Sequence, residues 1–149
     1  MPLHNYTISF FIKLTNKDKR QAIFAESNIA IGEVKWVYID ANNKLALDYW
    51  PPGGGVAASI TPLETDRLYH CAVTESPTQR RLFINGDFDV AAPAEDYIGQ
   101  PIDDRRLGDR YYLGASHFLL DGILDEFRID HRILTDAEIK LQSQRRYPL

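Results

Sequence analysis

Apolar and polar residues alternate along several short segments of this 149-residue chain, and turn-forming residues separate the segments. The clearest segment is 6–14, where every second residue is apolar. A period of two places one set of side chains against a core and the other toward solvent, which is typical of antiparallel strands. Further strands of this kind are expected at 21–26, 35–40, 44–50, 68–74, 80–84, 110–114 and 123–130. The pattern therefore predicts an all-β antiparallel sandwich.

Turn residues join some of these segments into hairpins. Asn85 and Gly86 are the strongest short hairpin signal in the chain, because both residues tolerate a positive φ. Asn42 and Asn43 favour a second hairpin, which joins the two halves of 35–50. The stretches expected to be loops are the Pro- and Gly-rich 51–56 and the charged 91–109.

The C-terminal part of the chain combines a strand with a helix start. Asp121 and Gly122 form a turn pair before the expected strand 123–130. The apolar residues expected on one face of this strand are Ile123, Phe127 and Ile129. Thr135 and Glu138 then form a capping box, in which each side chain accepts a hydrogen bond from the backbone amide of the other residue. One short helix is therefore expected to begin at Thr135.

Four segments resemble, in the same order, those of the concanavalin A-like, laminin-G-like domain family. Segment 6–13 is similar to the family's Phe-Thr-Ile-Ser-x-Trp-Val-Lys strand, and 68–74 to its Trp-x-His-Val-Ala-Val-Thr strand. Segment 81–86 is similar to its Leu-Tyr-Val-Asn-Gly strand and turn. Segment 122–139 is similar to its Gly-x-Ile-Asp-Glu-x-Arg-Ile strand followed by an Arg-x-Leu-Ser-x-Glu-Glu-Ile helix start.

The resemblance implies one domain over residues 1–149, folded as an antiparallel two-sheet jelly roll with one short C-terminal helix. In this family another strand usually precedes the one that resembles 6–13, and it pairs near the C-terminal strand. Residues 1–4 are too few to form it. Either the domain lacks this strand, or another segment or chain supplies it. In the first case the edge of 123–130 has unpaired amides and carbonyls.

Composition excludes several classes of function. The net charge is −4 with acids and bases mixed, whereas nucleic-acid binding needs clustered positive charge, so no nucleic-acid partner is expected. No apolar run approaches the roughly 20 residues of a membrane span, and the N-terminus contains no signal-peptide hydrophobic region. Cys71 is the one cysteine of the chain and alternates with Tyr69 and Val73, so it is expected to be a buried, inert thiol.

Aromatic and acidic residues share one face of the 35–50 hairpin. If Val37 and Ile39 point inward, opposite Leu47 and Leu45, the outer face contains Trp36, Tyr38, Asp40, Lys44, Asp48 and Trp50. Sugars bind to such faces because their C–H groups stack on aromatic rings and their hydroxyls bind carboxylates. The ligand-binding residues predicted from this pattern are Trp36, Tyr38, Asp40, Asp48 and Trp50, with both indoles at least partly exposed. In the alternative, a neighbouring loop covers the aromatic rings and they form a second core.

The resemblance also implies a calcium site, since relatives often bind Ca²⁺ through aspartates and loop carbonyls. The acids nearest the corresponding loops are Asp87, Asp89, Asp121 and Asp125, of which Asp121 and Asp125 are the candidate metal ligands. In the alternative, Asp125 and Glu126 are structural and bind arginines or backbone amides. No cofactor is expected to be required.

A catalytic pair of acids is not expected. Related glucanases place carboxylates in a Glu-x-Asp-x-Glu strand, but here Glu126 and Asp130 are four residues apart with Arg128 between them. An arginine at this position keeps both acids ionised, which is unsuited to a general acid. No catalytic residue is therefore assigned.

These observations favour a non-catalytic binding module with a glycan ligand. The alternative is a protein-interaction or assembly module that uses an exposed sheet edge or face, with a homodimer through the edge of 123–130 as one form. The sequence leaves localisation open. An extracellular or surface-exposed position is expected if the chain is a module of a larger protein.

Overall fold

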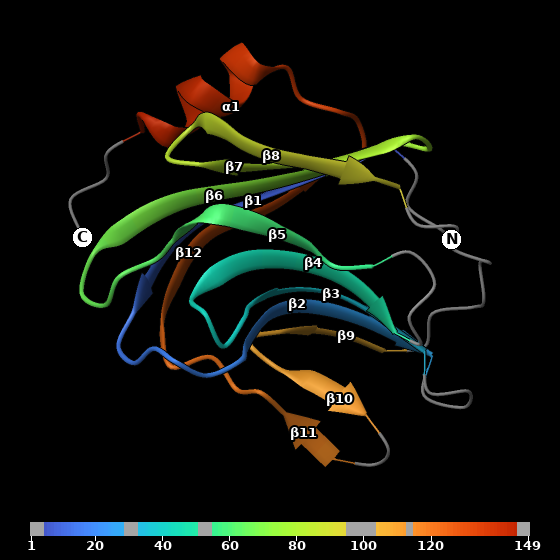
Figure 1. Ribbon diagram of the computed structural model, residues 1–149, viewed down its shortest axis with the longest axis vertical. Coiled ribbons are helices and arrows are strands. Elements are labelled where there is room, and N and C mark those ends of the chain that lie inside the picture. The colour runs from blue at the N-terminus through green and yellow to red at the C-terminus, as the bar shows by residue number, and fades with distance from the viewer. Residues whose placement is uncertain (1–4, 29–32, 51–54, 95–103, 113–114, 146–149) are drawn as a thin grey trace.

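The computed structural model describes residues 5–28, 33–50, 55–94, 104–112 and 115–145, without the side chains of residues 33, 50, 111, 112, 115 and 116. Two five-stranded antiparallel sheets face each other in a sandwich (Figure 1). The first sheet has the order β12 (Gly122–Asp130), β1 (Tyr6–Leu14), β6 (Leu68–Glu75), β7 (Gln79–Ile84), β8 (Asp87–Pro93). The second has the order β5 (Ala57–Pro62), β4 (Lys44–Trp50), β3 (Glu33–Ile39), β2 (Gln21–Asn28), β9 (Asp104–Leu107).

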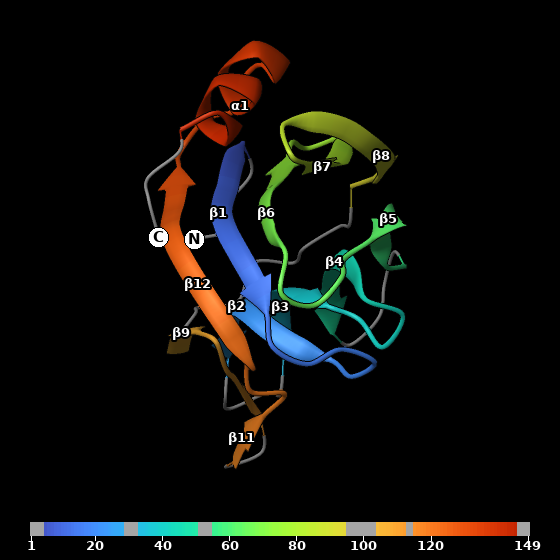
Figure 2. The same cartoon turned by 90° about the vertical axis from the view of Figure 1, so that its left-hand side faces the viewer.

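Two smaller elements lie outside the sandwich. The helix α1 (Asp136–Ser143) covers the outer side of the first sheet, and the hairpin of β10 (Arg110–Tyr112) and β11 (Ala115–His117) lies beyond the second (Figures 1 and 2). Thr135 caps α1 through the predicted capping box, with both reciprocal hydrogen bonds formed. Among the described residues, no helix is long and apolar enough to cross a membrane.

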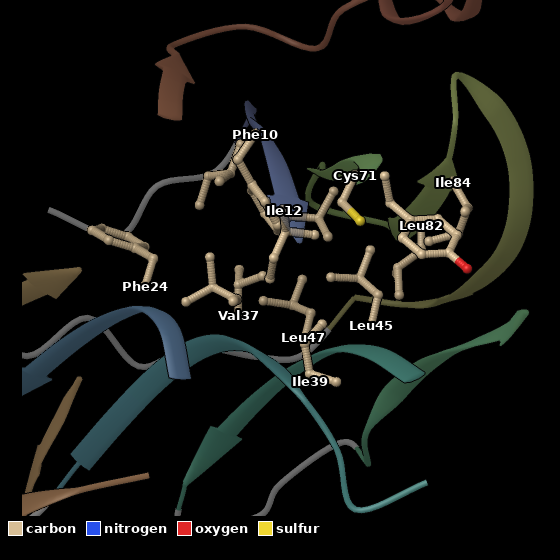
Figure 3. Packing of buried hydrophobic residues seen from close by; sticks show 14 of the residues in the cluster. Phe10, Ile12, Phe24, Val37, Ile39, Leu45, Leu47, Cys71, Leu82 and Ile84 are labelled. Carbon is tan, nitrogen blue, oxygen red and sulfur yellow. The ribbon is translucent and has the colours of Figure 1, made fainter. Parts of the chain in front are cut away.

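The core lies between the inner faces of the two sheets. Val37, Ile39, Leu45 and Leu47 of the second sheet point toward residues such as Cys71 of the first (Figure 3). Each of these residues is almost fully buried, and such burial stabilises the fold by roughly 1.5–3 kcal/mol for each large aliphatic side chain. The predicted inward direction of the hairpin residues is confirmed, and so is the burial of the Cys71 thiol, which raises its pKa well above the usual value.

The predicted strands are confirmed with small shifts at their ends, but the expected loop 91–109 is wrong in part. It contains the end of β8 and all of β9, which pairs with β2 along the edge of the second sheet. Segment 104–107 is mostly charged and lacks the apolar face by which a strand is predicted. Its pairing with β2 depends on the backbone and on an ion pair between Arg105 and Glu26. The sequence pattern likewise does not predict β5, β8 and β11, although the Asn85–Gly86 turn implies a strand after it.

A bulge changes which side chains of β12 face the core. The pairing of β1 with β12 shifts between Ser9 and Phe11, and Glu126 at the bulge has a φ of 46°. As a result, Leu124 packs against the core before the bulge, and Phe127 and Ile129 pack against it after the bulge. Ile123 is exposed, so its predicted place beside the other two is wrong. A single inserted residue reverses the alternation, and a strict period of two does not reveal it.

The two long sides of the sandwich differ. On one side the Asp89 carboxylate of β8 accepts hydrogen bonds from the Ile60 and Thr61 amides of β5, which joins the sheets. On the other side β12 pairs with β1 alone among the described strands. The prediction that an extra strand is missing from this edge stays a prediction.

Polar side chains also connect the sheets inside the sandwich. The Tyr6 hydroxyl of β1 donates to the Glu75 carboxylate of β6 at 2.5 Å, and the same carboxylate pairs with the Lys35 ammonium of β3. The burial of Tyr6 and the neighbouring Glu75 charge raise the pKa of its phenol well above 10. Lys35 precedes Trp36 and points to the opposite face of β3, so this ion pair helps to fix the position of Trp36 in the second sheet.

Candidate functional site

The outer face of the second sheet brings together the predicted aromatic and acidic residues. Trp36 lies opposite Asp48 on β4, and Tyr38 lies opposite Ala46, as the alternation predicts. Small side chains surround the two rings and form the floor of this face: Ala22, Ala25, Ala46 and Ala58. Because these neighbours are small, the aromatic pair is the bulkiest described feature of the strand surface.

The predicted exposure of Trp36 is wrong, because the ring is 3% exposed. Its indole stacks on the Tyr38 ring with a centroid distance of 3.7 Å and an interplanar angle of 7°. Tyr38 is 4% exposed, and burial, followed by the nearby Asp48 charge, raises the pKa of its phenol to about 12. The alternative prediction, in which the aromatic rings are covered, is therefore correct for Trp36 and Tyr38. The side chain of Trp50 lies outside the described residues.

Arg110 and Phe118 lie against the Trp36 ring, and the sequence pattern predicts a role for neither. The Arg110 guanidinium carbon lies 4.5 Å from the Trp36 ring centroid and 5.8 Å from that of Phe118. The Phe118 ring lies 5.5 Å from the Trp36 ring. Arg110 begins β10 and Phe118 follows β11, and the contact of β10 with β2 is a tertiary contact, so no local pattern marks these two residues.

Asp48 lies at the open side of the covered rings and is half-buried. Burial raises the pKa of its carboxyl, and the Tyr49 amide and the charges of Arg80 and Arg110 only partly oppose this effect. The carboxylate accepts the Tyr49 amide at 2.8 Å. Its second oxygen can accept a hydrogen bond from a ligand hydroxyl, and such bonds are stronger in a site from which water is partly excluded.

A buried donor lies beside this carboxylate. The Nε1–H of Trp36 is inaccessible to solvent and donates to no described residue at hydrogen-bonding geometry, although it is close enough to Asp48 to lower the pKa of that carboxyl. Leaving such a donor unpaired costs about 1–3 kcal/mol. Groups of this kind concentrate at functional sites, where a ligand or an ordered water completes the hydrogen bond.

Asp40, the remaining predicted ligand-binding acid, has a structural role in its own turn. Its Oδ1 accepts hydrogen bonds from the Asn42 and Lys44 amides at 2.8 and 2.9 Å, while Asn43 has the predicted positive φ, 64°. Asp40 is nevertheless part of the same outer face and keeps a half-exposed carboxylate.

The two candidate calcium ligands have protein partners. The Asp121 carboxylate accepts from the Asn16 amide at 2.6 Å and pairs with the Lys19 ammonium at 3.0 Å, which lowers its pKa. Asp125 accepts from the Glu126 amide. Within the described ranges no three acidic, histidine or cysteine side chains gather in a cluster that could hold a metal ion. Calcium binding stays a prediction.

Of the two acids of β12 that the sequence places beside Arg128, Glu126 has the arginine as its described partner. The Arg128 guanidinium lies 3.1 Å from the Glu126 carboxylate, whereas a buried carboxylate oxygen of Asp130 has no hydrogen-bond partner among the described residues. The expectation that Arg128 pairs with both acids is therefore met for Glu126.

Comparison with solved structures finds the same fold in several other proteins. The CBM40 of the Ruminococcus gnavus IT-sialidase, solved with alpha2,3 sialyllactose bound, has a TM-score of 0.77 and 15% identity, covering 94% of this chain and 83% of that one. A heptameric SAP-like pentraxin from Limulus polyphemus has a TM-score of 0.72 and 14% identity, covering 95% and 70%. A leech intramolecular trans-sialidase has a TM-score of 0.76 and 18% identity, covering 97% of this chain and 24% of that one.

At these identities the likeness establishes the jelly-roll fold alone. No curated protein sequence matches the chain. The family model of the concanavalin A-like lectin/glucanases superfamily, a laminin-G-type family, matches residues 1–140. This match covers every described strand and the first five residues of α1. The chain belongs to the concanavalin A-like lectin/glucanases superfamily.

Proposed function

We propose that this chain is a non-catalytic carbohydrate-binding module whose ligand binds on the outer face of the second sheet. The superfamily and the fold support this proposal, because similar structures include a module solved with a bound sialylated oligosaccharide. A fold accommodates many functions, so the argument depends on the residues of the face itself.

The observation that carries the proposal is the half-buried Asp48 carboxylate beside a buried indole donor. Trp36 and Asp48 lie opposite each other on adjacent strands, and the indole lowers the pKa of the carboxyl, against the larger effect of burial. The carboxylate accepts the Tyr49 amide, and a sugar hydroxyl can donate a further hydrogen bond to it.

The absence of catalysis is part of the proposal. Some similar structures are sialidases, but this chain aligns with only 24% of the leech trans-sialidase. The described acids of the candidate face are Asp48 and Asp40, and Asp40 is engaged by the Asn42 and Lys44 amides of its own turn. Glycoside hydrolysis requires two carboxyl groups roughly 5–9.5 Å apart across the scissile bond, and we propose that Asp40 and Asp48 do not form such a pair. We also propose an extracellular or surface location, where glycans are available as ligands.

A glycan array followed by titration calorimetry tests the proposal. Sialylated and neutral oligosaccharides are screened with the wild-type chain, with and without calcium, so that the same experiment tests the calcium prediction. Asp48→Asn is expected to weaken binding by roughly tenfold or more, because a charged acceptor is lost. The variant should stay folded, since burial already disfavours the ionised carboxylate.

The matched control is Asp87→Asn, which removes an exposed aspartate of the first sheet that pairs with Lys140. It should leave affinity unchanged. If the wild type binds no oligosaccharide on the array, the carbohydrate proposal is wrong. If both variants weaken binding equally, the outer face of the second sheet is not the site.

A second candidate function is assembly through the edge of β12, which has β1 as its one described neighbour. The bulge at Glu126 and the charges of Arg128 and Asp130 count against continuous strand pairing with another chain. Light scattering after gel filtration at micromolar concentration decides between a monomer and a dimer, and a clean monomer would end the assembly alternative.

A further inference from the structure

We propose that Phe118 is the aromatic ring on which the ligand stacks, and that the ligand presents the C–H face of a pyranose to it. The inference rests on the proposed carbohydrate-binding function. It reassigns the role that the sequence pattern gave to Trp36 and Tyr38. Those two rings are buried and act as support beneath the site.

Accessibility distinguishes the three described rings of this face. Trp36 and Tyr38 stack on each other, and the guanidinium of Arg110 lies over the Trp36 ring, so neither ring has a face available for a sugar. Phe118 is 36% exposed, although it touches Trp36 from above. Stacking requires an accessible ring face, and among the described aromatic residues of this face Phe118 alone meets that condition.

The backbone around Phe118 is held in place from several sides. Its carbonyl accepts the Ala22 amide of β2 at 2.6 Å, and the Leu120 amide donates to the Gly108 carbonyl at 2.9 Å. The Asp121 amide donates to the side chain of Gln21. A ring fixed in this way loses little freedom when a ligand binds, which favours its use as a binding platform.

The backbone conformation of Phe118 is a second, independent observation in favour of a binding role. Its φ is 58°, in the left-handed region that bulky residues rarely adopt and that costs about 1 kcal/mol or more. Glycine or asparagine would fit this backbone without the cost. A strained aromatic residue whose ring is left partly exposed gains little stability in return, so the strain is consistent with a role in binding.

The geometry of the sheet sets the extent of the site. Phe118 lies beside β2, through its hydrogen bond to Ala22, and Asp48 lies on β4. Strand β3 with Trp36 runs between them. The Phe118 ring lies 5.5 Å from the Trp36 ring, and Trp36 lies opposite Asp48. One sugar ring on Phe118 can therefore place a hydroxyl, or the next sugar of the chain, near Asp48.

Replacing the ring tests the inference with a matched control. Phe118→Ala is expected to weaken oligosaccharide binding roughly three- to tenfold, the range that an aromatic contact contributes. Phe118→Trp should retain the affinity of the wild type. Phe88→Ala is the control, because Phe88 is an exposed phenylalanine of the first sheet with Arg81 at 4.9 Å from its ring, which resembles the setting of Phe118.

Each outcome has one meaning. Weakening by Phe118→Ala together with unchanged binding by Phe88→Ala supports the inference. If Phe118→Ala binds as well as the wild type, or more tightly, the ring is a structural cover and the inference is wrong, while a loss of binding by Asp48→Asn would still support the proposed function. If the wild type binds no oligosaccharide, the proposed function and this inference both fail.

Discussion

The outer faces of the two sheets are both covered, but by different means. On the first sheet, Leu134 and Ile139 from the helical segment pack on Ala72 and Phe83 and form a small core. Ion pairs at both ends of α1 add to this contact, between Arg81 and Asp136 and between Lys140 and Asp87. On the second sheet, the cover consists of one guanidinium and one partly exposed ring, those of Arg110 and Phe118.

The first sheet has a structural cover: Leu134 and Ile139 are almost fully buried, and α1 hydrogen-bonds its own N-terminus. The cover of the second sheet leaves the Phe118 ring partly exposed and the Asp48 carboxylate half-buried with a raised pKa. A ligand can reach groups of this kind, which supports the proposal that the second face is the binding face.

The largest expected effect is on the first face. Ile139→Ala should lower the free energy of unfolding by about 2–5 kcal/mol, because it leaves a cavity under α1 at a fully buried position. Urea denaturation followed by circular dichroism measures the change. Leu141→Ala on the exposed side of the same helix is the control and should cost less than about 0.5 kcal/mol. Equal effects would mean that α1 does not seal this face.

A histidine on the same outer face should make stability depend on pH. Burial, with a smaller contribution from the Arg128 charge, lowers the pKa of His70 from 6.5 to about 4. The unfolded chain therefore takes up a proton near pH 6.5 that the folded chain does not bind until about pH 4. The free energy of unfolding should fall by roughly 3 kcal/mol as the pH decreases across this window.

Comparison of the wild type with His70→Gln isolates this contribution, since the carboxylates titrate in both. Urea midpoints at pH 7, 6, 5 and 4 should fall less steeply for the variant. His117→Gln, at an exposed histidine, should behave as the wild type. If the urea midpoints of all three proteins fall equally steeply with decreasing pH, His70 is protonated in the folded state over this range.

The capping box contributes a smaller amount to the cover of the first face. Thr135→Ala removes the acceptor of the Glu138 amide at the N-terminus of α1 and should lower the free energy of unfolding by about 1 kcal/mol. Thermal unfolding measured by calorimetry detects such a change. Thr135→Ser keeps the hydroxyl and should restore most of the stability, and a cost as large as that of Thr135→Ala would rule out the cap as the cause.

The smallest effect is expected on the second face. Phe118→Ala should change the free energy of unfolding by less than about 1 kcal/mol, because the ring is partly exposed and its backbone is strained. The same urea experiment measures this value. A loss as large as that of Ile139→Ala would make the two covers alike and would end the distinction between a structural and a functional face.

Alternation and capping predict most of the fold for local reasons. The inward direction of Val37, Ile39, Leu45 and Leu47 follows from a period of two, because successive side chains of a strand point to opposite faces. The helix start at Thr135 follows from hydrogen bonds over three residues. Where local chemistry contradicts the pattern, the prediction fails: the bulge at Glu126 moves Ile123 out of the core, and the charged β9 pairs through its backbone.

For the candidate site, the sequence by itself determined that Trp36, Tyr38 and Asp48 share one face of one hairpin. Only the tertiary structure decided whether that face is open. The segment that supplies Arg110 and Phe118 is about 70 residues away in the chain and reaches the face through contacts with β2. Alternation fixes the direction of a side chain but carries no information about what packs against it, because that depends on which distant segments the fold brings together.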